Sequence, residues 1–170
     1  MLSHLRAGGT AEEPWLASVT PEQAGWTYCG LRVLGLPPGG AHEFGLAGDE
    51  AVLLPLAGSC VVVCDGERFT LSGRESVFHG VTDFAYLPRE ASARVTSAGG
   101  GRFALATARA DERLAPRYGP AAAVPVELRG AGTPAAGPYR GTRRSSARAV
   151  ASANRPPTAL DTRALLSRGR

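Results

Sequence analysis

Apolar and polar residues alternate in short runs along the first 130 or so residues of the chain. The segments 92–97 ("SARVTS") and 102–108 ("RFALATA") send polar and apolar side chains to opposite faces, as a half-buried β-strand does. Other short runs, rich in β-branched, aliphatic or aromatic residues, read as further strands. They cover residues 30–36, 51–56, 60–64, 67–71, 83–88 and 124–128.

Turn-forming residues separate these runs. The segment "PPGG" at 37–40 cannot continue a strand, and three glycines at 99–101 mark another break. Asp65 and Gly66 stand between two apolar runs and predict a tight hairpin, because both central positions of a type I′ turn need a positive φ.

Helix signals are few. Residues 20–25 predict a short helix with Thr20 as its N-cap and Pro21 at its first position, and residues 109–115 are a second candidate. Many closely spaced strands with so little helix predict an all-β fold, an antiparallel β-sandwich or barrel.

Composition sets limits on the class of protein. The chain has 170 residues, of which 44% are hydrophobic, enough for one domain with a substantial core. No stretch approaches about 18 consecutive apolar residues, so we expect no membrane span. The N-terminal segment "MLSHLRAGGTAEEPW" lacks the apolar centre of a signal peptide, which favours a cytoplasmic location.

Charge is divided unevenly along the chain. Residues 1–139 carry 11 arginines and 14 acidic residues, net −3, whereas residues 140–170 carry 8 arginines and one acid, net +7. The formal net charge of +4 therefore describes the tail rather than the domain. We expect no nucleic-acid partner for the domain, because its own charge is slightly negative.

The three cysteines suggest no site. Cys60 and Cys64 lie on the same face of one predicted strand, separated by roughly 13 Å along it, which is too far for a disulfide. Together with Cys29 they are expected to be buried, reduced thiols. The alternative, a redox or nucleophilic cysteine, has no support from neighbouring residues.

Four segments in a fixed order resemble the N-terminal half of the 5-deoxy-glucuronate isomerase family of myo-inositol catabolism. They are "GWTYCGLRVLGLPPGG", "GDEAVLLPLAGSCVVVCDGERFTLSGRESVF", "TDFAYLPR" and "VPVELRGAG". The resemblance runs from about Trp26 to Gly132. It implies a bicupin, with two cupin barrels in one chain and a divalent metal, usually zinc, held by three histidines and one glutamate in the second barrel.

The first barrel's own metal-ligand positions can be tested in this sequence. Cupins hold a metal with His-x-His, a later Glu and a further His, and "GGAHEFGLAGDE" supplies His42 and Glu50 but has Phe44 in place of the second histidine. The position of the last histidine is Ala93, while His79 is out of register with the motif. His42, Glu50 and His79 are thus weak candidates for a metal site, which needs about three well-placed ligands. We expect no cofactor in this chain.

The tail departs from the family. The resemblance implies a second barrel after Gly132, but "TPAAGPYRGTRRSSARAVASANRPPTALDTRALLSRGR" follows, with few large apolar residues. We expect an N-terminal extension at 1–24, a barrel at 25–132 and a disordered arginine-rich tail at 133–170. An out-of-frame or truncated continuation is the main interpretation of the tail. A genuine short variant and a basic arm for anionic partners are the alternatives.

Two functions from different classes follow. By resemblance, the family isomerises 5-deoxy-D-glucuronate to 5-dehydro-2-deoxy-D-gluconate, but a chain without the metal-bearing barrel is expected to be inactive alone. The alternative is a metal-free cupin that binds a small ligand or acts as a scaffold. The expected partners are a uronate-type sugar, no membrane, and further copies of the chain through an exposed apolar face.

Other residues have a functional and a structural interpretation. Arginines could clamp a uronate carboxylate. The chain contains arginine but no lysine, however, so arginines scattered over the surface are expected in any case. Trp15 and Trp26 are interpreted as packing residues, and Asp83 as a turn residue rather than a general base. The candidate clamp residues are Arg32, Arg68, Arg74 and Arg89.

Overall fold

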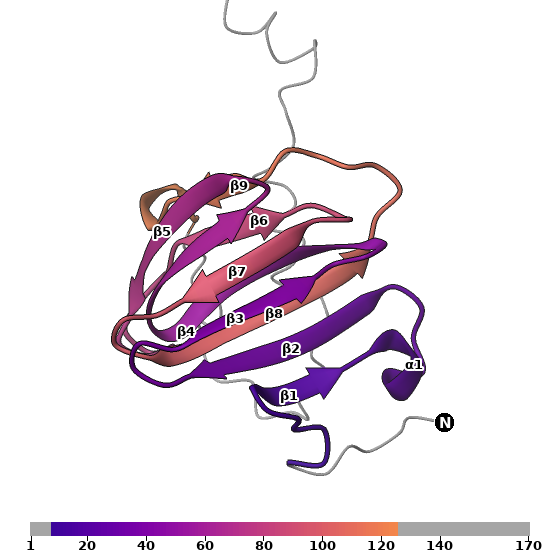
Figure 1. The fold of residues 1–170 in the computed structure, drawn as a ribbon, viewed down its shortest axis with the longest axis horizontal. Helices are drawn as coiled ribbons and strands as arrows, with labels where there is room; N and C mark the ends of the chain where they lie inside the picture. The colour runs from indigo at the N-terminus through magenta and orange to yellow at the C-terminus, as the bar shows by residue number, and fades with distance from the viewer. Residues whose placement is uncertain (1–7, 126–170) are drawn as a thin grey trace, which may run out of the picture. The chain divides into compact units, whose positions relative to one another are not determined.

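The computed structural model describes residues 8–125, which form nine β-strands, one short α-helix and one 3₁₀ turn (Figure 1). All strand pairs are antiparallel, as the sequence predicts. The strands are β1 (Trp15–Val19), β2 (Cys29–Leu36), β3 (Ala41–Gly45), β4 (Asp49–Cys64), β5 (Glu67–Arg74), β6 (Phe84–Leu87), β7 (Ser92–Thr96), β8 (Gly101–Arg109) and β9 (Arg117–Gly119); α1 spans Pro21–Ala24 and the 3₁₀ turn Ala121–Ala123.

Two sheets share the long strand β4. The first has the order β1-β2-β8-β4-β6-β9, and in the second β4 pairs with β5 and β7, while β7 also pairs with β3. The first half of β4, to Ala57, pairs with β8, and the second half, from Gly58, pairs with β5. The register shifts between Pro55 and Ala57 and again between Gly58 and Cys60, so the strand changes sheets through two bulges. The sequence predicted two separate strands here.

A close backbone approach explains the glycines at this crossing. Gly58 and Gly73 both have positive φ, 89° and 65°. A Cβ on Gly73 would overlap the carbonyl oxygen of Gly58, so no larger residue fits there without moving the backbone.

The core lies between the two sheets and follows the alternation of each strand. In β4 every second side chain is buried, at Ala51, Leu53, Pro55 and then, after the bulges, at Cys60, Val62 and Cys64. Strands of both sheets contribute to one hydrophobic cluster, against which Trp15 and Phe69 pack from the side. Its largest fully buried members are Phe103, Leu34, Leu53, Leu71, Leu87 and Leu105.

The sequence-based elements are confirmed in most places. The hairpin at Asp65-Gly66 has φ values of 50° and 83°, as its turn requires. Helix α1 begins with a capping box, in which the Thr20 hydroxyl accepts the Gln23 N–H and the Gln23 side chain accepts the Thr20 N–H.

One expected element is absent, and strands β1, β3 and β9 were not predicted. The helix at 109–115 is absent, and residues 110–116 form an irregular loop instead. Strand β3 was not predicted, because its five residues follow a Gly-rich turn and carry one buried side chain. Residues 15–19 of the expected N-terminal extension form β1, an edge strand on β2. The tail at 133–170 and most of the run 124–128 lie outside the described residues.

Candidate functional site

His42, the first candidate metal ligand, lies on β3 in an aromatic cluster. Its ring meets Trp15 edge-on, with the centroids 5.3 Å apart, and stacks on Phe44 at 6.3 Å. Trp15 also contacts Phe44 edge-on at 5.6 Å, which confirms Trp15 as a packing residue. His42 thus packs between the β1 edge and the core.

Glu50 and His79 lie in other surroundings. A carboxylate oxygen of Glu50, on β4, accepts a hydrogen bond from the Tyr86 hydroxyl at 2.7 Å. Burial, and then the bond to Glu50, raise the pKa of Tyr86. His79 lies in the exposed loop after β5, where its Nδ1 is 2.7 Å from the Ser76 hydroxyl. Within residues 8–125 no three or more His, Cys, Asp or Glu side chains are grouped to hold a metal.

The two positions at which the cupin motif needs histidines face each other across the sheet. Phe44 on β3 and Ala93 on β7 are direct cross-strand partners. Both belong to the hydrophobic cluster, with 8% and 0% of their surfaces exposed. An aromatic ring and a methyl group offer no donor to a metal ion, so the residues of this barrel do not fit the family's zinc.

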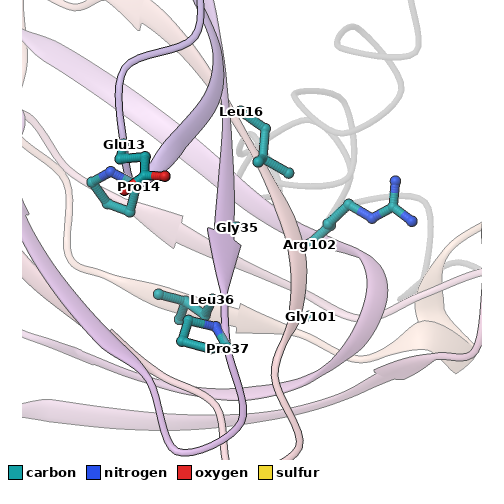
Figure 2. Close-up of a pocket in the computed structure, with 8 residues that line it drawn as sticks. All are labelled: Glu13, Pro14, Leu16, Gly35, Leu36, Pro37, Gly101 and Arg102. Carbon is teal, nitrogen blue, oxygen red and sulfur yellow. The ribbon is translucent and has the colours of Figure 1, made fainter.

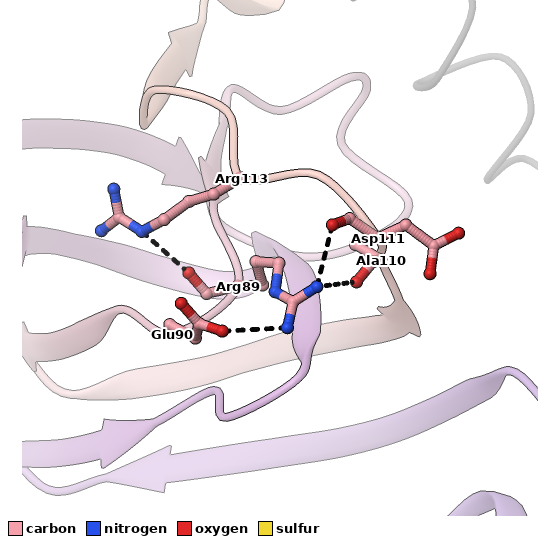
Figure 3. Close-up of polar contacts among 5 residues, drawn as sticks. All are labelled: Arg89, Glu90, Ala110, Asp111 and Arg113. Carbon is pink, nitrogen blue, oxygen red and sulfur yellow. Dashed lines mark hydrogen bonds and ion pairs between the residues drawn. The ribbon is translucent and has the colours of Figure 1, made fainter.

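Two of the four candidate arginines are committed to the backbone of the protein itself, and Figure 3 shows the contacts of one of them, Arg89. Arg89 donates to the carbonyl oxygens of Ala110 and Asp111 at 2.7 and 3.0 Å, and this holds the loop after β8 in its non-helical path. Arg113 from the same loop donates to the Arg89 carbonyl at 3.2 Å. Arg74 likewise donates to the carbonyl oxygens of Pro55 and Gly80.

Asp83 is a buried structural acid, with 3% of its surface exposed. Its carboxylate accepts the backbone N–H groups of Ser72 and Gly73 at 2.7 and 3.0 Å, and the Tyr118 hydroxyl at 3.0 Å. Burial, then the bond to Asp83, raise the pKa of Tyr118. Asp83 therefore ties β5 and β9 to the start of β6, a structural role that differs from the turn residue suggested by the sequence.

The cysteines divide into two environments. Cys60 and Cys64 are buried, and burial raises the pKa of their thiols to about 12 and about 11. Cys29 is exposed on β2, contrary to expectation. Trp26 is exposed too, by 49%, and its indole N–H donates to the Cys29 carbonyl.

A polar pocket lies beside Arg32, the third candidate arginine. Its volume is about 160 Å³, and strands β2, β4 and β8 line it together with the start of α1. The charged or hydroxylic side chains around it are Thr20, Glu22, Arg32, Asp49, Thr107 and Arg109. The guanidinium of Arg32 lies over the Trp15 ring, 5.4 Å from its centroid. Sequence spacing could not show this group, because 75 residues separate Arg32 from Thr107.

A larger pocket, of about 820 Å³, lies near the other end of β2 (Figure 2). Apolar residues and glycines line most of it, including Leu16, whose side chain lies over Gly35. Its two charged residues are Glu13 and Arg102, and the Arg102 side chain points away from Glu13 in this view. This open apolar surface brings no reactive groups together, so the smaller pocket is the better candidate site.

The antiparallel fold of residues 8–125, with Phe44 and Ala93 buried in its core, is that of a cupin-like barrel. Residues 2–151 match the KduI/IolB family, and the chain belongs to this family of sugar isomerases. The match is wider at both ends than the interval of resemblance from Trp26 to Gly132.

One solved structure supports the assignment, and a second is reported for its weaker likeness alone. An IolB-like protein of Salmonella typhimurium is 29% identical, with a TM-score of 0.67 over 72% of this chain. A cupin protein of Bacteroides fragilis is 16% identical, with a TM-score of 0.44 over 56% of this chain and 79% of its own. No curated protein matches. The chain spans 48% of the length of the Salmonella protein, about half.

The structure contains no helix, within residues 8–125, that has the length and hydropathy to cross a membrane.

Proposed function

We propose that this chain is the metal-free barrel of a cytoplasmic 5-deoxy-glucuronate isomerase of myo-inositol catabolism. The reaction converts an aldose to a ketose and moves hydrogen between C1 and C2 of the sugar. No residue of the described barrel is assigned to that transfer. The catalytic metal, a zinc-type divalent ion, belongs to a second barrel of the family's bicupin plan.

The pair of Phe44 and Ala93 carries this proposal. These residues occupy the positions where the cupin motif needs ligands, and they pack against each other inside the core. The barrel has therefore kept the fold while its interior is built for packing. The family membership and the half-length match to the Salmonella protein support the same assignment, with the metal in a second barrel and none in this one.

The test is an isomerase assay on the purified chain of 170 residues, with and without added Zn²⁺ or Mn²⁺. We expect no measurable turnover, because loss of a Lewis acid costs several kcal/mol of transition-state stabilisation, on the order of a thousandfold in rate. Elemental analysis after dialysis should find no stoichiometric metal. Metal-dependent turnover, or one equivalent of metal lost on His42→Ala, would contradict the proposal.

A second candidate is a metal-free cupin that binds a small ligand or acts as a scaffold. The polar pocket at Arg32 favours ligand binding. Leu16 and Leu31, exposed by 50% and 44%, favour a scaffold that associates with further copies. Sedimentation of the purified chain separates the two: a monomer at all concentrations argues against the scaffold.

A further inference from the structure

The outer face of the first sheet, the side turned away from the core, is apolar. Strands β2, β4 and β8 send Leu34, Leu53 and Leu105 into the core, so the residues next to these in each strand point outward. Cross-strand pairing with β1 places the outward residues in two rows, and all of them are aliphatic. The rows, here called the outer apolar face, are Val19, Leu31, Ala106 and Val52, and Ala17, Val33, Ala104 and Leu54.

The second sheet is different, because its outer side carries charges. Exposed and buried residues alternate strictly in β7, where Arg94 lies on the outside and pairs with Glu43 of β3 at 3.9 Å. Arg68 of β5 is exposed as well. Such alternation is typical of an antiparallel sheet with one solvated face, whereas apolar residues on both faces are typical of a sheet that is covered on both sides. The outer apolar face therefore has the composition of a covered surface.

Much of the outer apolar face is nevertheless open to solvent. Leu31 is 44% exposed, and Leu16, at the end of the face, is 50% exposed. Val33 and Val52 are partly exposed. The face is about 26 Å long, from the eight residues of β2, and about 19 Å wide across four strands, which gives about 500 Å². Two copies of it bury about 1,000 Å² in total, the size at which a protein interface becomes specific.

The charges at the two ends of the face suit a second copy of the chain. Glu50 lies at one end of the β4 segment that pairs with β8, and Arg102 lies opposite Ala57 at the other end. A two-fold axis across the strands turns the second copy end for end, so Glu50 of each copy lies near Arg102 of the other. The apolar rows then meet apolar rows, and opposite charges meet at both ends.

We propose that the outer apolar face is the contact surface between two copies of this chain, packed sheet on sheet about a two-fold axis. Leu31, Val33 and Val52 of both copies form the buried centre, and Glu50 pairs with Arg102 at each end. The proposal rests on the scaffold alternative and names its partner, and it is independent of the isomerase proposal. The buried area is at the small end of the specific range, so we expect a Kd of about 10 μM.

Sedimentation of the purified chain, at concentrations on both sides of this Kd, should show an equilibrium between monomer and dimer. Leu31→Glu should raise the Kd about 30-fold or more, because the two-fold axis places the new charge in the interface twice. Val63→Glu is the matched control. Val63 lies on the outer side of the second sheet, paired with Arg68 and Arg94, so this variant should leave the Kd unchanged.

A charge swap tests the orientation of the two copies. Arg102→Glu should raise the Kd about tenfold, because it brings like charges together at each end, and Glu50→Lys added to Arg102→Glu should restore it. Failure to restore the Kd in a folded double variant would overturn this pairing. Circular dichroism shows whether each variant is folded.

Two outcomes of the sedimentation experiment contradict the proposal in different ways. A chain that is monomeric at every concentration would overturn it together with the scaffold alternative, and would assign the outer apolar face to another occupant. A dimer of unchanged Kd in folded Leu31→Glu would exclude this face and leave the scaffold alternative standing. Neither outcome changes the result expected in the isomerase assay.

Discussion

The centre of the barrel and its polar pocket are built by the same strand alternation and differ in residue type. At the centre, Phe44 and Ala93 are cross-strand partners buried in the hydrophobic cluster. At the pocket, Arg32 and Thr107 lie on strands that contribute Leu34 and Leu105 to the same core. The backbone determines which positions face inward. The residue types at those positions determine whether that part of the barrel is an apolar core or a polar pocket. The same barrel therefore has an apolar centre and a polar pocket at its end.

The largest expected effect is at the centre. Phe44→Ala should lower the free energy of unfolding by about 4 kcal/mol, because it leaves a cavity beside Ala93 and removes the contact with Trp15. Urea denaturation measures the change. Arg32→Gln, at the pocket, is the comparison and should cost about 1 kcal/mol or less. If the two variants lost equal free energy of unfolding, the centre and the pocket would not differ in their contribution to stability.

Two aspartates, Asp83 in the interior and Asp49 at the pocket, allow the same comparison with one residue type. Asp83→Ala should cost about 3 kcal/mol, because the buried N–H groups of Ser72 and Gly73 lose their acceptor. Asp49→Ala, at the pocket, should cost less than about 0.5 kcal/mol, as for a residue outside the core. Thermal and urea unfolding measure both. A mild effect of Asp83→Ala would mean that water replaces the carboxylate and that this end of the barrel is open to solvent.

The fold was more predictable than the site. Alternation and turn residues are local signals, and they located most strands, the Asp65-Gly66 hairpin and helix α1. Strand β3 was missed because its five residues follow a Gly-rich turn and include one buried side chain, whereas β7 has two in alternation. The single strand β4 was divided because its crossing between sheets, through Pro55 and Gly58, resembles a break in sequence. The pocket depends on antiparallel pairing of Gly30 with Thr107, which no spacing along the chain reveals.

The helix expected at 109–115 failed for a tertiary reason. The Arg89 side chain binds the carbonyl oxygens of Ala110 and Asp111, and these would otherwise be acceptors within a helix. The pairing of β3 with β7 likewise depends on the tertiary structure. Phe44 and Ala93 could nevertheless be singled out from the sequence, because the cupin motif gives their positions. The sequence could therefore single out Phe44 and Ala93, but not the polar residues that gather at the pocket.

The buried thiols give a pH-dependent test of the centre. Burial raises the pKa of Cys60 to about 12 and that of Cys64 to about 11, from an ordinary value of about 9. The unfolded chain therefore loses these protons first, and stability should fall as pH rises from about 9 toward 12. At pH 10 each thiol should account for about 1 kcal/mol of that fall. Unfolding curves from pH 8 to 11 measure it, and Cys64→Ala should flatten the slope.

Thiol labelling at pH 8 checks the same comparison without unfolding. Cys29 is exposed and should react at once, whereas Cys60 and Cys64 should react after denaturation. Rapid labelling of all three in the native protein would show that the centre opens readily.

The smallest expected effect is at His79, the candidate ligand in the exposed loop after β5. Its Nε2 is 3.6 Å from a Glu75 carboxylate oxygen, and the two side chains are 58% and 83% exposed. His79→Ala should therefore change the free energy of unfolding by less than about 0.5 kcal/mol. Added Zn²⁺ should leave the Tm of both proteins unchanged, since a bound metal would stabilise the folded state by mass action. A Zn²⁺-dependent rise in Tm that His79→Ala removes would show that the loop residues form a metal site after all. The contrast between an apolar centre and a polar pocket would then describe the interior of the barrel alone, and not the chemistry of its surface.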